Sequence, residues 1–196
     1  MLSNTNRTEI KKGAHKAVYD VSKLHAIIDE SLIAHVAITN ESGPVVIPML
    51  AWRVDDYVYI HGANNSRLLR SLKQGVQTCL TFTLFDGWVL ARSAFHHSAH
   101  YRSAVVFGQF EMVENNQEKD RLQNHFIEQI APGRTKQVRL SNEKRAQSHH
   151  AAAYPTHRGI CENQQFWRQR RCGRHGYSCL GRCPTLPNRR RSAASL

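Results

Sequence analysis

The stretch ARSAFHHSAHYRSAVVFG, at residues 91–108, concentrates the side chains of this sequence that are best able to do chemistry. It places His96, His97 and His100 within five positions, followed directly by Tyr101 and Arg102. Neutral imidazoles bind zinc, and their ordinary pKa of about 6.5 also suits proton transfer at neutral pH. The stretch therefore raises two hypotheses, a metal site and an acid–base site.

Neither hypothesis finds the additional residues that it needs. A catalytic zinc site usually has three protein ligands with a supporting hydrogen-bond layer, yet no Cys, Asp or Glu lies between Gly87 and Gln109. The hydrolytic motifs GxSxG and HExxH are absent from residues 1–144. We therefore expect no bound metal, and we interpret the histidines as the lining of a pocket or as a polar connection packed at a subunit seam.

A second group of candidates lies in HGANNSRLLR, at residues 61–70. Ser66 and Arg67 begin a predicted helix, where free backbone N–H groups and the positive end of the helix dipole attract an anion. Arg67 and Arg70 add positive charge. This start could bind a phosphate group; the alternative interpretation is a capped surface helix with two solvated arginines.

The elements that would position these residues are mostly short strands. Helical spacing of apolar residues predicts helices over 21–31, 64–75 and 116–130. Alternation and turn residues predict strands over 34–40, 44–54, 57–62, 76–85, 88–95 and 103–114, with a hairpin turn at Asp86 and Gly87. Six strands in hairpin order predict a mainly β protein, a small antiparallel barrel flanked by short α-helices.

The charge is distributed unevenly along the chain. The net charge of +12 comes mostly from residues 145–196, which contain 10 Arg and a single acid, whereas residues 1–144 contain 17 Lys and Arg against 14 Asp and Glu. The cationic tail suggests an arginine-rich arm for nucleic acid. Its four cysteines lack the paired spacing of a zinc module. Without a long apolar run or a signal-peptide pattern, we expect a cytoplasmic protein with no membrane partner.

Three segments together identify a family resemblance. KKGAHKAVYD (11–20), YVYIHGANNSRLLRSL (57–72) and LARSAFHHSAHYRSAVVFGQFEMVEN (90–115) closely resemble the pyridoxamine 5′-phosphate oxidase-like family of FMN-binding split barrels, in its flavin-nucleotide-binding and nitroimidazole-resistance branch. The resemblance covers about residues 11–139. It implies a six-stranded antiparallel split β-barrel over residues 1–144, and a homodimer with an FMN in a groove at the dimer interface.

The resemblance also implies which residues bind FMN. It places the strand end at His61 beside the flavin phosphate, near Ser66, Arg67 and Arg70. Arg92 could both stack on the isoalloxazine ring and donate two hydrogen bonds to its dioxo side. The full expected set is His61, Ser66, Arg67, Arg70, Arg92, Ser93, Tyr101 and Arg102. No catalytic residue is predicted.

The resulting functional hypothesis is an FMN-dependent oxidoreductase that acts on a small organic substrate and accepts electrons from NAD(P)H. The alternatives are a flavin-binding module without turnover and, less favoured, a nucleic-acid binder acting through the arginine-rich tail. We cannot match the substrate-phosphate residues of pyridoxamine-phosphate oxidation in this sequence, so that reaction is not favoured.

Residues 145–196 do not resemble the family, and a change of reading frame near Arg145 would explain this. Codons re-read from their second nucleotide can encode EASVKI from residues 158–163 and IPVWAGVLP from residues 177–185. Both resemble parts of the family's C-terminal region. The tail is then expected to be disordered, and its charge to carry no function.

The gene sequence tests the frame hypothesis. We expect the second frame to stay open from near codon 145 through both words, because the original coding sequence would be preserved there. A stop codon inside either word would exclude a frame change.

Overall fold

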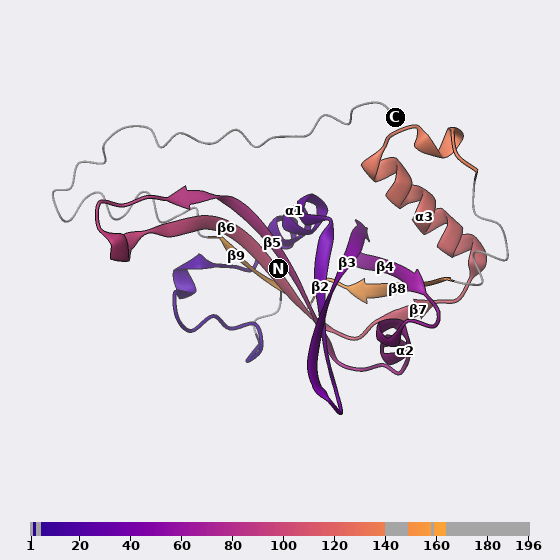
Figure 1. The fold of residues 1–196 in the computed structure, drawn as a ribbon, viewed down its shortest axis with the longest axis horizontal. Helices are drawn as coiled ribbons and strands as arrows, with labels where there is room; N and C mark the ends of the chain where they lie inside the picture. The colour runs from indigo at the N-terminus through magenta and orange to yellow at the C-terminus, as the bar shows by residue number, and fades with distance from the viewer. Residues whose placement is uncertain (1, 3–4, 140–148, 158, 164–196) are drawn as a thin grey trace.

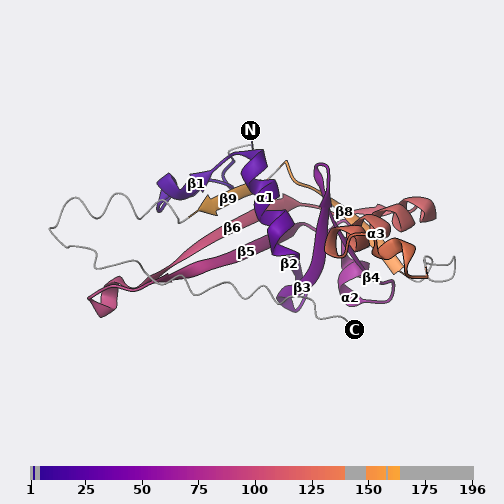
Figure 2. The same cartoon turned by 90° about the horizontal axis from the view of Figure 1, so that it is seen from above.

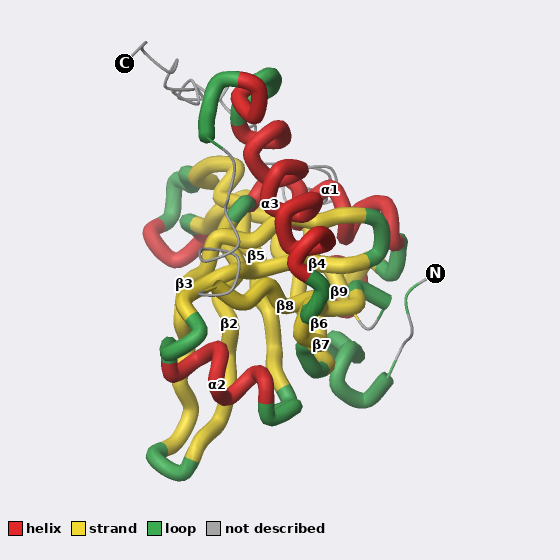
Figure 3. Tube along the Cα trace, turned by 90° about the vertical axis from the view of Figure 1, so that its right-hand side faces the viewer, coloured by secondary structure: helices red, strands yellow, loops and turns green. Residues whose placement is uncertain are grey.

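The computed structural model describes residues 2, 5–139, 149–157 and 159–163, and a single antiparallel sheet is its main feature (Figure 1). The strand order is β1-β9-β6-β5-β2-β3-β4-β8-β7. The strands are β1 (Ala17–Val18), β2 (Ile33–Asn40), β3 (Gly43–Val54), β4 (Tyr57–Ala63), β5 (Thr78–Val89), β6 (Ser98–Gly108), β7 (Glu111–Val113), β8 (His149–Pro155) and β9 (Gly159–Asn163). The sheet curls around one apolar core, consistent with a split barrel (Figure 3).

Three α-helices in the described residues flank the sheet: α1 (Val21–Ser31), α2 (Arg67–Lys73) and α3 (Asn116–Ile130). The described residues also form three 3-10 turns: η1 (Ala14–Lys16) before β1, η2 (Ala94–His96) between β5 and β6, and η3 (Arg134–Lys136) after α3. In the views of Figures 1 and 3, α1 and α3 lie above the sheet and α2 below it. No helix in the described part of the chain is long and apolar enough to cross a membrane.

The helix predictions are confirmed, with α1 and α3 at the expected residues and α2 shorter than expected. Each begins at a side-chain cap: Asp20 accepts from the Ser22 N–H, Ser66 from the Leu69 N–H, and Asn115 from the Gln117 N–H. Apolar periodicity was therefore sufficient to locate the helices, and these caps fix the residue at which each one begins.

The predicted hairpin turn at Asp86 and Gly87 is wrong. β5 continues through these residues to Val89, and the irregularity is a β-bulge between Phe85 and Gly87. Gly87 has a φ of +148°, whereas Asp86 does not have the positive φ that the two-residue hairpin turn requires. The chain instead reverses around η2, so the segment predicted as a separate strand at 88–95 is partly a continuation of β5.

Residues beyond 144 also depart from the expected boundary. β8 pairs with β4 from Tyr57↔Pro155 to Ala63↔His149, and β9 pairs with β6 and β1. These strands were not predicted because the segment's polar and arginine-rich surroundings masked the short apolar run AAAY. Gly159 lies so close to α1 that a Cβ there would be 2.8 Å from Leu24 Cδ2. Residues 164–196, which hold most of the predicted tail, lie outside the described residues.

The core forms because alternate strand residues and one face of α1 point to the same interior. Leu24, Ile27 and Ile28 of α1 are buried against inward-facing residues of the sheet, among them Ala34, Val36, Leu80, Phe82, Ala104 and Val106. A smaller cluster lies under α3, where Trp52 and Tyr59 pack on Leu122 and Phe126.

The β8 residue Tyr154 joins three strands at the centre of this core. Its side chain is fully buried, and its hydroxyl donates to the Thr78 carbonyl of β5 at 2.9 Å, with Val106 of β6 at 3.4 Å. Its ring also packs on Phe110, with 4.6 Å between the ring centroids. Residues beyond 144 therefore contribute directly to the stability of the sheet.

We expect Tyr154→Phe to lower the free energy of unfolding by about 1–2 kcal/mol, because a buried carbonyl loses its donor. Urea unfolding measures this, with Tyr57→Phe as the control, since Tyr57 is 38% exposed and lies on the neighbouring strand. An equal loss in both variants would contradict the role assigned to the buried hydroxyl.

Candidate functional site

The most prominent feature of the surface is an arm formed by residues 87–100, the distal part of β5 and β6 with η2 at its tip. Figures 1 and 2 show it extending from the body of the molecule. Large apolar side chains on the arm are exposed: Trp88 by 64%, Leu90 by 74% and Phe95 by 91%. Exposed apolar residues gathered on a projecting element are typical of a binding surface.

Three of the predicted flavin residues lie on the arm or at its base. Arg92 and Ser93 precede η2 and are exposed at the tip. Tyr101 is half-buried in β6 and pairs with Phe85, just before the bulge. Arg92 and Ser93 therefore lie in a turn and not in the strand that the sequence predicted over residues 88–95.

The three histidines occupy different environments. His97 is held in place, because its Nδ1 accepts a hydrogen bond from the Ala91 N–H at 2.9 Å. His96 is exposed, and its ring meets that of Phe95 edge-on at 5.5 Å between centroids. His100 pairs with Gly87 in the ladder, and its Nδ1 is buried without a hydrogen-bond partner in the described residues. No three His, Cys, Asp or Glu side chains in the described ranges are placed to hold a metal ion together.

Arg102, another predicted flavin ligand, is engaged by two carboxylates. Its Nε and Nη2 donate to Asp86 at 3.0 and 2.8 Å, and its Nη1 and Nη2 donate to Glu30 at 2.7 and 3.0 Å. These hydrogen bonds, first those to Asp86 and then those to Glu30, raise the pKa of Arg102 above its ordinary value. All three guanidinium nitrogens therefore already donate hydrogen bonds within the protein.

The phosphate-binding candidates lie at the opposite end of the molecule, on α2. Ser66 is the N-cap, and its hydroxyl accepts from the Leu69 N–H at 3.2 Å. Arg67 and Arg70 are exposed on the first turns of the helix. The geometry fits both earlier interpretations, a capped surface helix and an anion site rimmed by two cations.

His61 is not brought to the start of α2 within one chain. Its ring packs in the cluster under α3, 5.8 Å from the Trp52 ring and 6.3 Å from the Phe126 ring. The next residue, Gly62, faces α2 instead, since a Cβ there would be 3.4 Å from Leu69. Because side chains alternate along a strand, His61 and α2 lie on opposite faces of β4.

The predicted site residues thus form two separate groups in one chain. Ser66, Arg67 and Arg70 lie on α2 near β4 and β7, whereas Arg92, Ser93 and Tyr101 lie on or beside the arm. Figures 1 and 2 place α2 and the tip of the arm at opposite sides of the molecule. A single chain does not assemble them around one ligand.

The outer face of the β2–β3 pair is also apolar and exposed. Ile33 pairs with Leu50 and Ala37 with Val46, and these residues point to the same face. Ile33, Val46 and Leu50 are 44%, 58% and 51% exposed. Residues 44–52 of β3 form a continuous apolar run, so both faces of this strand carry apolar residues.

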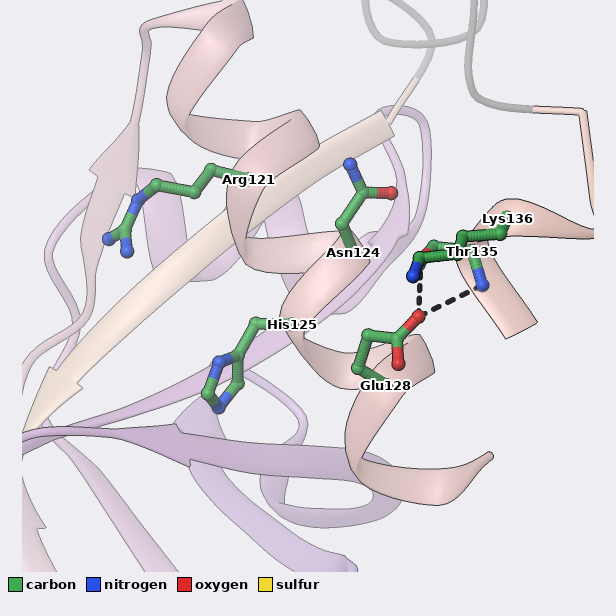
Figure 4. Close-up of a pocket in the computed structure, with 6 residues that line it drawn as sticks. All are labelled: Arg121, Asn124, His125, Glu128, Thr135 and Lys136. Carbon is green, nitrogen blue, oxygen red and sulfur yellow. Dashed lines mark hydrogen bonds between the residues drawn. The ribbon is translucent and has the colours of Figure 1, made fainter. Parts of the chain in front are cut away.

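A separate hollow lies beside α3 and η3, and none of the predicted site residues lines it (Figure 4). Glu128 at its edge accepts hydrogen bonds from the backbone N–H groups of Gly133 and Thr135 and from the Thr135 hydroxyl. These bonds, above all the one from the Thr135 hydroxyl, lower the pKa of Glu128. The carboxylate therefore holds the loop after α3, and the hollow is not the predicted site.

Sequence reasoning missed the exposed aromatic residues of the arm and the two acidic partners of Arg102. Glu30 carried a usable signal, because an acidic side chain in the last turn of a helix opposes the helix dipole and so suggests a cationic partner elsewhere. Asp86 carried none, since Asp-Gly equally suits a turn or a bulge.

Comparison with known proteins places this fold in a family. The sequence profile described as pyridoxamine 5′-phosphate oxidase matches residues 20–158. The chain belongs to the pyridoxamine 5′-phosphate oxidase-like split-barrel family. The match reaches residue 158, so a change of frame, if present, would begin beyond the position expected from the sequence.

Among solved structures, a flavocytochrome from Azotobacter vinelandii is similar with a TM-score of 0.77 and 30% identity, over 82% of this chain and 74% of that one. A protein from Mycobacterium smegmatis described as binding FAD and haem has a TM-score of 0.72 and 31% identity, over 76% and 74% of the two chains. A 5-nitroimidazole antibiotic resistance protein from Bacteroides thetaiotaomicron shares the fold, with a TM-score of 0.61 and 21% identity over 74% and 84%. None of the curated proteins matches the sequence.

Proposed function

We propose that this protein binds FMN between two copies of the chain and acts as a flavin-dependent oxidoreductase on a small organic substrate. The observation that carries the proposal is the arm, which holds Arg92, Ser93 and Tyr101 away from the phosphate-binding candidates of α2. In a symmetric dimer, the arm of one copy can reach the α2 region of the other. Two equivalent sites result, each with residues from both chains.

The apolar outer face of β2 and β3 supports the dimer. Ile33, Val46 and Leu50 are about half exposed and lie on one face of the β2–β3 pair. Burying such a patch against its symmetric copy removes apolar area from water, worth roughly 25 cal/mol per Å². The arm adds Trp88 and Leu90 to the surface available for the same contact.

Several side chains fit the parts of a flavin. The Arg92 guanidinium is exposed and planar, which suits the dioxo side of an isoalloxazine ring. Arg67 and Arg70 suit the phosphate. When bound, the flavin would carry the electron transfer, while these residues hold and orient it and the apolar arm excludes water. NAD(P)H is the proposed electron donor.

Flavin titration of the purified protein tests the proposal. We expect quenching of FMN fluorescence by the wild type and about tenfold weaker binding by Arg92→Ala, because a charge-assisted hydrogen bond is lost. Arg121→Ala is the matched control, since Arg121 is also an exposed arginine but lies on α3. If FAD binds more tightly than FMN, FAD takes the place of FMN in the proposal. If neither flavin binds, the proposal is contradicted.

Mixed dimers test whether the two chains share each site. Arg67→Ala and Arg92→Ala are each expected to weaken both sites of their own homodimer. Co-expressed differently tagged copies should form heterodimers that regain one site of wild-type affinity, since one site then contains neither substitution. Heterodimers without such a site would contradict shared sites, and bleaching of bound flavin by NADH or NADPH would support turnover.

A second candidate function is haem binding on the arm, favoured by the exposed His96 beside the exposed Phe95. Haem iron takes an imidazole nitrogen as an axial ligand, and the macrocycle needs apolar neighbours such as Trp88 and Leu90. His97 is a poor ligand in this geometry. Its Nδ1 accepts a hydrogen bond from the Ala91 N–H, so the proton of the neutral ring lies on Nε2. Neither ring nitrogen then has a lone pair available for the iron.

Haemin titration tests this candidate. We expect a shifted Soret band with the wild type that is lost in His96→Ala, because the axial ligand is removed. His35→Ala, which removes another exposed histidine on β2, is the control and should keep the band. An unchanged band in His96→Ala would contradict ligation by His96.

A further inference from the structure

The arm leaves the body at a cluster of three charged side chains. Arg102 of β6 donates two hydrogen bonds to Asp86 of β5 and two to Glu30 of α1, with distances between 2.7 and 3.0 Å. The Arg102 and Asp86 side chains are partly buried, at 20% and 17% exposure, while Glu30 is 55% exposed. We call these three residues the clasp.

The backbone explains why the clasp forms at this point. Asp86 is the extra residue of the bulge, lying between the pairs Phe85↔Tyr101 and Gly87↔His100. A bulge turns a side chain away from its regular direction and changes the direction of the strand. Arg102 pairs with Leu84 on the body side of the bulge, so its side chain can reach the turned carboxylate.

The third member connects the bulge to a rigid part of the fold. Glu30 lies in the last turn of α1, and α1 is anchored in the core by Leu24, Ile27 and Ile28. Figure 2 shows α1 lying across β5 and β6 near this point. The clasp therefore ties the bent base of the arm to a helix that does not belong to the arm.

We propose that Arg102 is a positioning residue, which through Asp86 and Glu30 fixes the direction of the arm and does not itself bind the flavin. All of its three donor nitrogens already donate to carboxylates. Direct contact with a flavin would require breaking a partly buried bidentate pair, at a cost that a single new contact does not recover. The predicted effect of Arg102 on flavin affinity rests on the proposed function, whereas its predicted effect on the direction of the arm does not.

The chemistry of arginine suits this role. Its planar fork can hold two carboxylates in a fixed geometry, while a lysine offers one mobile charge. Arg102→Lys should therefore order the base of the arm less well than the wild-type arginine does. Neutral substitutions of nearly equal shape, Asp86→Asn and Glu30→Gln, remove the charge of each partner and leave the packing almost unchanged.

Two measurements on these variants separate positioning from direct binding. Hydrogen exchange of the flavin-free protein follows the order of residues 84–104, and flavin titration follows affinity. We expect about tenfold faster exchange at the base of the arm in Asp86→Asn and Arg102→Ala, because the charge-assisted hydrogen bonds that order it are lost. Flavin binding should weaken by similar factors in both variants.

The matched control is Asp29→Asn. Asp29 is the neighbour of Glu30 on α1 and forms an equivalent bidentate pair with Arg53 of β3, at 2.6 and 2.9 Å. Its loss should not change exchange in the arm. The comparison separates a general loosening of α1 from release of the arm.

Direct flavin binding by Arg102 predicts the opposite result for one variant. Asp86→Asn would then free the guanidinium and keep or strengthen flavin binding, while Arg102→Ala would abolish it; that pattern would overturn the proposal. Unchanged exchange of the arm in Asp86→Asn would overturn it as well. If the wild type binds no flavin, the proposed function fails, but the exchange measurement still decides whether the clasp orients the arm.

Discussion

The antiparallel pairing of β5 with β6 is the constraint on which the rest of the structure depends. One half of this ladder, from Thr78 to Phe85, lies in the body and contributes Leu80 and Phe82 to the core, with Ala104 and Val106 opposite. The other half leaves the body as the arm. The same two strands therefore build the core and present Arg92 and the aromatic side chains to solvent.

The bulge at Asp86 separates these two roles. Before it, alternate residues are buried beneath α1; beyond it, Trp88 and Leu90 are exposed because no element among the described residues covers them. The clasp forms at this transition, where a strand under little packing constraint needs polar contacts to keep a defined direction. Ion pairs of this kind contribute modestly to stability when exposed, but they specify geometry when they are bidentate and partly buried.

The exposed surfaces give the monomer the features of an incomplete unit. The face of β2 and β3 and the arm both leave apolar residues in water, which a folded chain avoids when it can bury them. In the proposed dimer, a second copy would cover apolar residues of this kind and bring together two groups of residues that one chain holds apart. Formation of the proposed interface would therefore also complete the proposed ligand site.

Local sequence determined the helices and most strands, because caps, apolar periodicity and alternation act over a few residues. Ser66 identified the beginning of α2, and apolar periodicity located α1 and α3, without knowledge of the rest of the chain. The resemblance of three segments identified the family, since segments that occur together in order are more specific than any one of them alone.

Tertiary structure decided what these elements do. Only pairing with β6 turned Asp86 and Gly87 into a bulge instead of a hairpin turn, because the partner strand offers hydrogen bonds beyond that point. Only packing placed His61 under α3, committed Arg102 to Asp86 and Glu30, and brought β8 into the sheet. Such outcomes depend on residues that are distant in the chain and meet only after folding, so no local pattern could contain them.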